Sequence, residues 1–245
     1  MKLKFRVVAA LLAALTLSSL PASSKGSSEG QLVDSGSFGI FRQGRRIGTE
    51  TFTIHQQSDF SVTASQLKIE DGNDKATQSS ELKIASNGDL RHYEWKELTP
   101  EKAQATVDYQ DQFLTEHITV APGAKPREHA FMLPASTVIL DDFFIHREVL
   151  LWRYLASYCG TALQGCKLQA SKFGVVIPHQ QVSTTISVNY DGPEKVAFHG
   201  AERELNRFTL QSEDGATWTF WVDSSYPFKL LRILVPSENV EVVRD

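Results

Sequence analysis

The sequence of 245 residues has little of what enzyme and metal sites are usually built from. It contains only two cysteines, and no two of its seven histidines stand at the spacing of metal ligands. It has no Gly-x-Ser-x-Gly elbow, no His-Glu-x-x-His pair, no glycine-rich phosphate loop and no loop of alternating carboxylates. We therefore predict no catalytic residue, no metal and no cofactor, and the absences favour a protein that is not an enzyme.

Long apolar runs and an excess of basic residues are missing as well. No apolar stretch of 18 residues follows residue 24, so we expect no transmembrane segment once the first 24 residues are removed. The remaining chain carries 22 basic and 29 acidic residues, a net charge of −7, and no Lys/Arg cluster interleaved with aromatic residues. This charge balance argues against a nucleic acid partner, which would be held through its phosphates.

Residues 1–24 have the pattern of an export signal. Three basic residues precede an apolar run from Val7 to Leu17, and small residues stand before Lys25, where a signal peptidase would cut. The run has about 11 residues, whereas a helix that spans a bilayer needs about 20. We predict a signal peptide over residues 1–24 and a mature protein that is periplasmic or secreted.

The two cysteines are Cys159 and Cys166, with six residues between them. In an oxidising compartment such an isolated pair favours a local disulfide, and two free thiols are the alternative. The spacing matches neither a Cys-x-x-Cys redox centre nor a zinc site.

Most of the chain alternates between apolar and polar residues over short stretches, which predicts antiparallel strands with one face in solvent. Gln43-Gly44 and Asn87-Gly88 stand between alternating runs and predict hairpins. Turns are also expected near Asp111 and at Asp191-Gly192-Pro193.

Domain boundaries follow from composition. Residues 25–35 are rich in serine and glycine and predict a flexible start to the mature chain, with ordered structure from about Gly36. Residues 36–245 are then expected to form a single β-rich domain.

One segment departs from the strand pattern. Residues 138–157 contain neither glycine nor proline and place apolar side chains on two arcs of a helical wheel, which predicts a long helix buried against a sheet. Asp141 or Asp142 is expected to cap or favour its first turn. The order strands, helix, strands predicts a mainly β fold, in which a large curved antiparallel sheet (a half-barrel or open barrel) wraps one long buried helix. Two sheets with the helix at their junction are the alternative.

Three stretches of the chain resemble a known type of protein. These are GIFRQGRRIGTETFTI, VILDDFF with the following LLWRYL, and TWTFWVD with PFKLLRILVP. They resemble uncharacterised exported bacterial proteins of domain-of-unknown-function families with a half-barrel sheet, which are distantly similar to periplasmic lipoprotein-carrier-like proteins. The resemblance spans most of residues 36–245. It implies the half-barrel fold and an apolar ligand, and it carries over no catalytic residue.

Large side chains on the helix and on a late strand are candidates for lining an apolar pocket. Ordinary core packing is the alternative for the same side chains. The candidate ligand-binding residues are Phe143, Phe144, His146, Leu151, Trp152 and Trp218.

A second candidate group consists of Asp142, His146 and Arg153, which share one stripe of the expected helix. A carboxylate one turn before an imidazole would raise the pKa of the imidazole, as a general base or a ligand clamp requires. The alternative is that this stripe is simply the polar edge of the helix.

Three functions agree with these patterns. The first is an exported non-enzymatic binding or carrier module for an apolar, lipid-like ligand held between sheet and helix. The second is an interaction or structural protein of the envelope with a filled core and no small-molecule ligand, and the third is an enzyme of unrecognised chemistry. The expected partner is accordingly an apolar small molecule or an envelope protein, and a hollow sheet–helix interface would favour the first function.

Overall fold

The computed structural model describes residues 30–72, 75–159, 163 and 166–245. The signal peptide predicted for residues 1–24 lies outside these described residues. The strands that precede the helix are β1 (Gln31–Arg42), β2 (Arg45–Gln56), β3 (Phe60–Ile69), β4 (Ala76–Ala85), β5 (Leu90–Thr99), β6 (Gln104–Gln110), β7 (Phe113–Thr119), β8 (Arg127–Phe131) and β9 (Val138–Ile139). The elements that follow are α1 (Ile145–Tyr158), β10 (Ser171–Ile177), η1 (Pro178–Gln180), β11 (Val182–Phe198), β12 (Ala201–Ser212), β13 (Thr217–Val222), β14 (Leu230–Val235), η2 (Pro236–Glu238) and β15 (Val240–Arg244).

All the strands that the structure describes belong to one sheet, and the chain enters that sheet at its middle. From β1 the strands run outward in chain order to β8 at one edge, and the chain then crosses to β9 at the other edge. From β9 they return inward until β15 pairs with β1. Neighbouring strands are antiparallel except β9 and β10, which are parallel.

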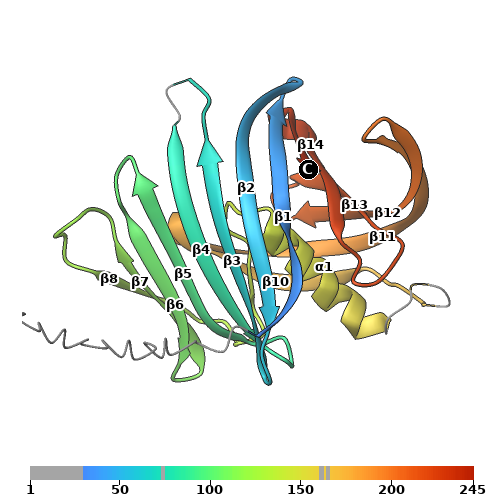
Figure 1. Ribbon diagram of the computed structural model, residues 1–245. Helices are drawn as coiled ribbons and strands as arrows, with labels where there is room; N and C mark the ends of the chain where they lie inside the picture. The colour runs from blue at the N-terminus through green and yellow to red at the C-terminus, as the bar shows by residue number, and fades with distance from the viewer. Residues whose placement is uncertain (1–29, 73–74, 160–162, 164–165) are drawn as a thin grey trace, which may run out of the picture.

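The sheet is strongly curved and encloses α1. Figure 1 shows β1–β8 as one bent wall and β10–β14 as a second wall that continues from it, with α1 between the two. The predicted mainly β fold is therefore confirmed, with a large open antiparallel sheet around the one α-helix of the described residues. The helix is buried along most of its length, including Leu150, Leu151 and Tyr154.

The hairpins follow from local turn chemistry. Gln43 and Gly44 both have positive φ, 52° and 77°, as a two-residue turn with the twist of its strands requires. Asp111 and Gln112 do the same between β6 and β7. The prediction of a turn at Asp191-Gly192-Pro193 is wrong. These residues form a bulge inside β11, where the pairing with β12 shifts by one residue. Gly192, with φ of 109°, lets this long strand bend instead of ending.

The helix is shorter than predicted and begins later. It has 14 residues from Ile145, whereas the sequence favoured a long helix over residues 138–157. Val138 and Ile139 instead form β9, because their β-branched side chains fit a strand and their backbone pairs with β10. The Arg147 guanidinium also donates to the carbonyls of Asp141 and Phe143, which holds the preceding turn outside the helix.

Ordered structure begins earlier than the sequence indicated. Gln31 to Ser35 were expected in a flexible segment but form the first part of β1, where they pair with β2. The serine- and glycine-rich composition did not predict this part of the strand, because pairing with β2 and the buried side chain of Asp34 stabilise it, whereas local propensity does not.

The apolar interior has two parts. The main core lies between α1 and the inner face of the sheet, and it includes Phe38, Phe143 and Phe220. A smaller cluster on the opposite face of the late strands contains Trp221 and Leu231. Trp221 and Phe220 are therefore on different faces, as period-2 alternation requires.

The described residues also bear on two further expectations. Cys159, just after α1, forms a disulfide with Cys166, with the two Cα atoms 5.5 Å apart. In the part of the chain that the structure describes, no helix is both long and apolar enough to pass through a membrane.

Candidate functional site

A cavity of about 740 Å3 lies beside the second half of α1. Its walls come from α1, from strands β1–β3 and from the turn that precedes β14. This volume is within the range of about 300–1,000 Å3 that is typical of small-molecule sites. The lining residues are Gln31, Leu32, Val33, Ile54, Gln56, Ser61, Thr63, Val149, Trp152, Leu155, Ala156, Cys159, Tyr226, Pro227 and Phe228.

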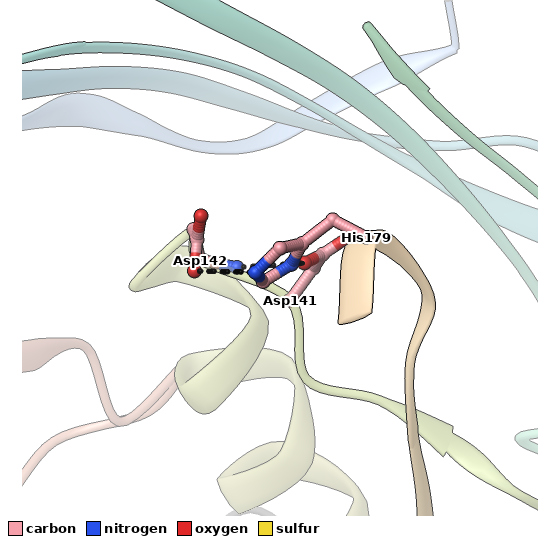
Figure 2. A group of neighbouring side chains, drawn as sticks. All are labelled: Asp141, Asp142 and His179. Carbon is pink, nitrogen blue, oxygen red and sulfur yellow. Dashed lines mark hydrogen bonds and ion pairs between the residues drawn. The ribbon is translucent and has the colours of Figure 1, made fainter. Parts of the chain in front are cut away.

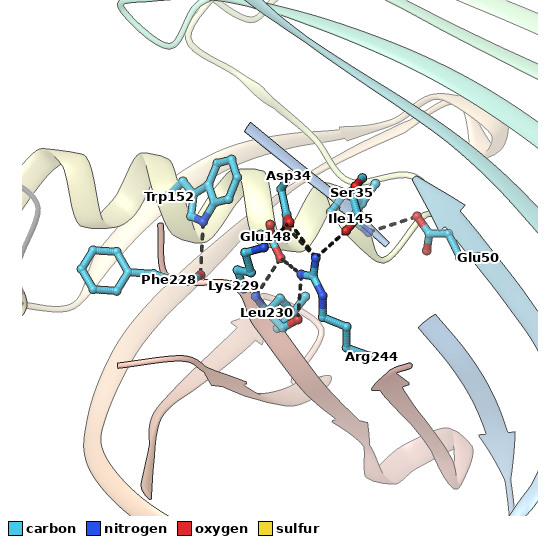
Figure 3. A network of polar contacts seen from close by, with 10 residues as sticks. All are labelled: Asp34, Ser35, Glu50, Ile145, Glu148, Trp152, Phe228, Lys229, Leu230 and Arg244. Atoms are coloured by element: carbon cyan, nitrogen blue, oxygen red, sulfur yellow. Dashed lines mark hydrogen bonds and ion pairs between the residues drawn. The ribbon is translucent and has the colours of Figure 1, made fainter. Parts of the chain in front are cut away.

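The chemistry of this lining is apolar and neutral. None of the described lining residues is Asp, Glu, Lys, Arg or His. The Trp152 indole N–H donates to the carbonyl of Phe228 at 3.2 Å (Figure 3). The one polar group of this side chain is therefore satisfied, and the apolar ring forms part of the cavity wall. The cavity therefore suits an uncharged, mostly apolar molecule.

The cavity reaches solvent at one side. Leu32 is 53% exposed and Tyr226 is 64% exposed, although both contribute to the lining. The polar lining residues Gln31, Gln56 and Ser61 come from the ends of β1, β2 and β3. A guest could therefore place an apolar body against Trp152 and a neutral polar group near these side chains.

A buried network of charges anchors the helix next to this cavity (Figure 3). Arg244 on β15 contacts both carboxylate oxygens of Asp34 on β1, at 2.7 and 2.8 Å. It also donates to Glu148 on α1 at 3.3 Å, and Lys229 contacts Asp34 at 2.7 Å. Glu148 in turn accepts the backbone N–H of Leu230 at 2.7 Å. The network joins the first strand, the last strand and the helix.

The two carboxyl groups of this network have opposite pKa shifts. Burial and the neighbouring charge of Asp34 hold the pKa of Glu148 well above its usual range. Burial also acts to raise the pKa of Asp34, but hydrogen bonds from Lys229 and Arg244 outweigh it and the pKa is lowered. Asp34 is therefore the ionised member of the pair.

The first turn of α1 is capped by a residue far away in the chain. Glu50 on β2 accepts the backbone N–H of Phe144 at 2.6 Å and that of Ile145 at 3.2 Å, while Ser65 donates to it at 2.7 Å. Phe144 itself provides no side-chain cap. Burial raises the pKa of Glu50 to about 7. The cap expected from Asp141 or Asp142 thus comes from β2 instead.

Immediately before α1, Asp141 and Asp142 meet His179 of η1 (Figure 2). His179 Nδ1 contacts the Asp141 carboxylate, and His179 Nε2 lies 3.6 Å from Asp142 Oδ1. Tyr93 on β5 donates to the other oxygen of Asp141 at 2.7 Å. These contacts join η1 and the chain before α1 to the far wall of the sheet.

The electrostatics of this group favour a charged pair. Burial acts to raise the pKa of Asp141, but the hydrogen bond from His179 and its positive charge outweigh burial and lower it. Burial acts to lower the pKa of His179, whereas the hydrogen bond to Asp141 and the charges of Asp141 and Asp142 raise it. Burial raises the pKa of Asp142.

A second cavity of about 360 Å3 lies near the first turn of α1. Its lining includes Phe144, Arg147 and Trp218 together with Asp142. The Arg147 guanidinium stands over the Trp218 ring, 4.8 Å from its centroid. Unlike the 740 Å3 cavity, this one contains charged side chains.

The structure distributes the six candidate ligand-binding residues over different places. Trp152 lines the 740 Å3 cavity, and Phe144 and Trp218 line the 360 Å3 cavity. Phe143, His146 and Leu151 are fully buried in the interior and line neither of these two cavities.

The stripe of Asp142, His146 and Arg153 does not form a site. Asp142 faces His179, the His146 ring lies 3.4 Å from the Ser80 hydroxyl, and Arg153 stands over the Phe173 ring. Burial lowers the pKa of His146 to about 3, which is opposite to the raised imidazole pKa that a functional site on this stripe would require. The charge of Asp141 opposes this shift but is outweighed by desolvation.

The polar residues that sequence reasoning missed share one signal. Asp34, Glu50 and Glu116 each occupy the inward phase of an alternating strand, as in Glu50-x-Phe52-x-Ile54 and Leu114-x-Glu116-x-Ile118. A carboxylate at such a position must find a partner inside the sheet, because burying it alone is costly. This pattern could have identified them.

Comparisons with known proteins add information on the fold alone. No family model matches this chain, and no curated protein matches it. It is similar in structure to a crystallised beta-barrel-like protein of the domain of unknown function DUF1849 from Brucella abortus, with a TM-score of 0.52 and 8% sequence identity. The match covers 87% of this chain and 96% of the other.

Proposed function

We propose that this protein is an exported, non-enzymatic binding or carrier module that holds a neutral, apolar molecule in the 740 Å3 cavity. The observation that carries the proposal is the uncharged lining of this cavity, with Trp152 as one wall. The implied resemblance to lipoprotein-carrier-like proteins, in which a curved sheet surrounds an apolar cavity, points in the same direction.

Location outside the cytoplasm is part of the proposal. It is supported by the basic and apolar pattern of residues 1–24 and by the disulfide between Cys159 and Cys166. Disulfides of this kind persist in oxidising compartments and are rare in the cytosol.

The two other functions have less support. An envelope protein with a filled core would leave no space of this volume beside the helix. An enzyme built on Asp142 and His146 would need these side chains to converge, whereas they face different partners, His179 and Ser80.

A titration of the full chain with Nile red, an uncharged apolar dye, tests the proposal. We expect saturable binding of one dye molecule per chain. Ala156→Trp adds bulk at a lining position and should weaken binding at least tenfold. Ser157→Trp adds the same bulk one position further along α1, outside the lining, and should bind like the wild type. Equal binding by the two variants, or no saturable binding, would overturn the proposal.

A further inference from the structure

The geometry points to a second ligand site in the 360 Å3 cavity, at which the Arg147 guanidinium binds the carboxylate of an amphiphile such as a medium-chain fatty acid. This inference goes beyond the proposed function. The ligand is anionic, and its cavity lies at the first turn of α1, whereas the uncharged 740 Å3 cavity flanks the second half of the helix. The volume is within the range of small-molecule sites.

The first observation is that Arg147 is a buried charge without a carboxylate partner. The residue is 7% exposed, and its guanidinium donates to backbone carbonyls but makes no ion pair with a described residue. Burial lowers the pKa of Arg147, and the more distant charges of Asp142 and Glu50 oppose this shift without offsetting it. Because buried charges are usually paired, an anion would complete this one.

The second observation is which part of this guanidinium remains free. Nη1 donates to the carbonyls of Asp141 and Phe143. The rings of Trp218 and Phe144 have their centroids 4.8 and 5.5 Å from the guanidinium carbon, as in cation–π contacts. Nε and Nη2 donate to no described residue, and neither is sealed inside the protein. These two nitrogens form one edge of the planar group, to which a carboxylate can bind with both oxygens.

The third observation is the apolar wall of the same cavity. Each of the strands β10–β15 contributes to the lining, and the buried apolar side chains among them include Ile186, Leu210 and Ile233. An alkyl chain that packs against these side chains leaves water, which favours binding. A guest with an apolar chain and one carboxylate therefore matches both the wall and Arg147.

Three carboxyl groups also line the cavity and limit the charge of the guest. Asp214 and Glu238 are exposed, so solvent and salt screen their charges. Burial raises the pKa of Asp142, which shifts this group toward its uncharged form. The cavity can therefore accept one negative charge on Arg147, whereas a phosphate with two charges would meet stronger repulsion.

Calorimetric titration of the full chain with sodium decanoate tests this site. The titrations use the Ala156→Trp variant, in which the added indole fills the 740 Å3 cavity and removes the other apolar site. We expect one decanoate per chain, bound at least tenfold more tightly than decan-1-ol, which has the same chain length without the charge. Decylammonium should also bind at least tenfold more weakly than decanoate.

Arg147→Gln, added to this variant, removes the charge and should weaken decanoate binding at least tenfold. Arg153→Gln is the matched control, because Arg153 also lies on α1 and stands over an aromatic ring, that of Phe173, but does not line this cavity. The control should leave decanoate binding unchanged.

A second pair of variants tests the site even where Arg147→Gln does not fold. Ala216→Phe adds bulk at a lining position and leaves the guanidinium in place, so decanoate should bind at least tenfold more weakly. Thr217→Phe adds a ring at the exposed neighbouring position, outside the lining, and should leave decanoate binding unchanged.

Decanoate binding that is absent, that decan-1-ol or decylammonium equals, or that persists unchanged in Arg147→Gln or in Ala216→Phe would overturn the inference. Nile red titration separates this outcome from the proposed function. Ala216→Phe alone leaves the 740 Å3 cavity unaltered and should bind the dye like the wild type. The dye and decanoate results can thus fail independently.

Discussion

The indole N–H of Trp152 donates to the carbonyl of Phe228 across 3.2 Å, joining the exposed side of α1 to the turn that precedes β14. Both residues line the 740 Å3 cavity, so this hydrogen bond connects two parts of its wall. The stiffness of the cavity wall depends on the helix and this turn remaining in contact.

Replacing Trp152 should therefore alter ligand binding. Trp152→Ala removes both the aromatic wall and the hydrogen bond, and we expect the dissociation constant for Nile red to rise at least tenfold, about 1.4 kcal/mol. Trp218→Ala, in the 360 Å3 cavity, is the control and should leave the constant unchanged. Fluorescence titration of both variants checks this, and equal effects would contradict it.

The buried pair of Arg244 and Asp34 should be important for stability. Arg244→Leu leaves Asp34 buried with Lys229 as its remaining cationic partner, and removing one member of such a pair costs about 3–5 kcal/mol. Arg46→Ala, which breaks a half-exposed pair with Asp245, should cost at most about 1 kcal/mol. Urea unfolding of the two variants measures the difference. Similar losses would mean that the buried network contributes no more than the surface pair.

Glu50 should stabilise the helix from β2. Glu50→Ala leaves the N–H groups of Phe144 and Ile145 and the Ser65 hydroxyl without their buried acceptor, and we expect the free energy of unfolding to fall by roughly 3 kcal/mol. Glu70→Ala removes an exposed carboxylate and should change it by less than about 0.5 kcal/mol. Thermal and urea unfolding followed by circular dichroism would detect this. A small loss in Glu50→Ala would show that the cap is dispensable.

His146 should make the protein less stable in acid. Its pKa is lowered to about 3 in the folded state from an ordinary 6.5, so the unfolded chain binds the extra proton. This contribution to stability is present above pH 6.5 and is lost as the pH falls toward 3, at about 1.4 kcal/mol per pH unit. The facing charges, Asp141 and Arg147, are the same in the wild type and in His146→Gln and cancel in the comparison.

The measurement for His146 is the difference in unfolding free energy between the wild type and His146→Gln at several pH values. We expect this difference to shift against the wild type by roughly 2 kcal/mol between pH 6.5 and pH 5. A pH-independent difference would contradict a buried, neutral imidazole.

The sequence predicted the parts of the fold that depend on local chemistry. Gln43-Gly44 specified its hairpin because both positions must take positive φ, and the two-sided apolar pattern around Leu151 specified a buried helix. The start of the helix was not predictable in this way. It depends on pairing of Val138 with β10 and on Glu50, both distant in the chain.

The same distinction applies to the site. Trp152 could be selected as a ligand-binding candidate because it is a large aromatic residue on the expected helix, and it does line the cavity. Phe143 and Leu151 have the same sequence character but fill the core, since helix rotation decides which side chain faces the open space. The sequence could not predict that the turn at Tyr226 lines the cavity, because this depends on how the sheet curves around the helix.

The most direct test of apolar ligand binding in the 740 Å3 cavity is a crystal structure of the protein soaked with 10-bromodecan-1-ol, a neutral amphiphile whose bromine can be located by anomalous scattering. We expect a bromine peak among Ile54, Trp152 and Phe228, with the alkyl chain beside α1. Crystals in which the soaked compound is absent from this cavity, or in which side chains fill the space, would contradict a ligand-binding role for the cavity.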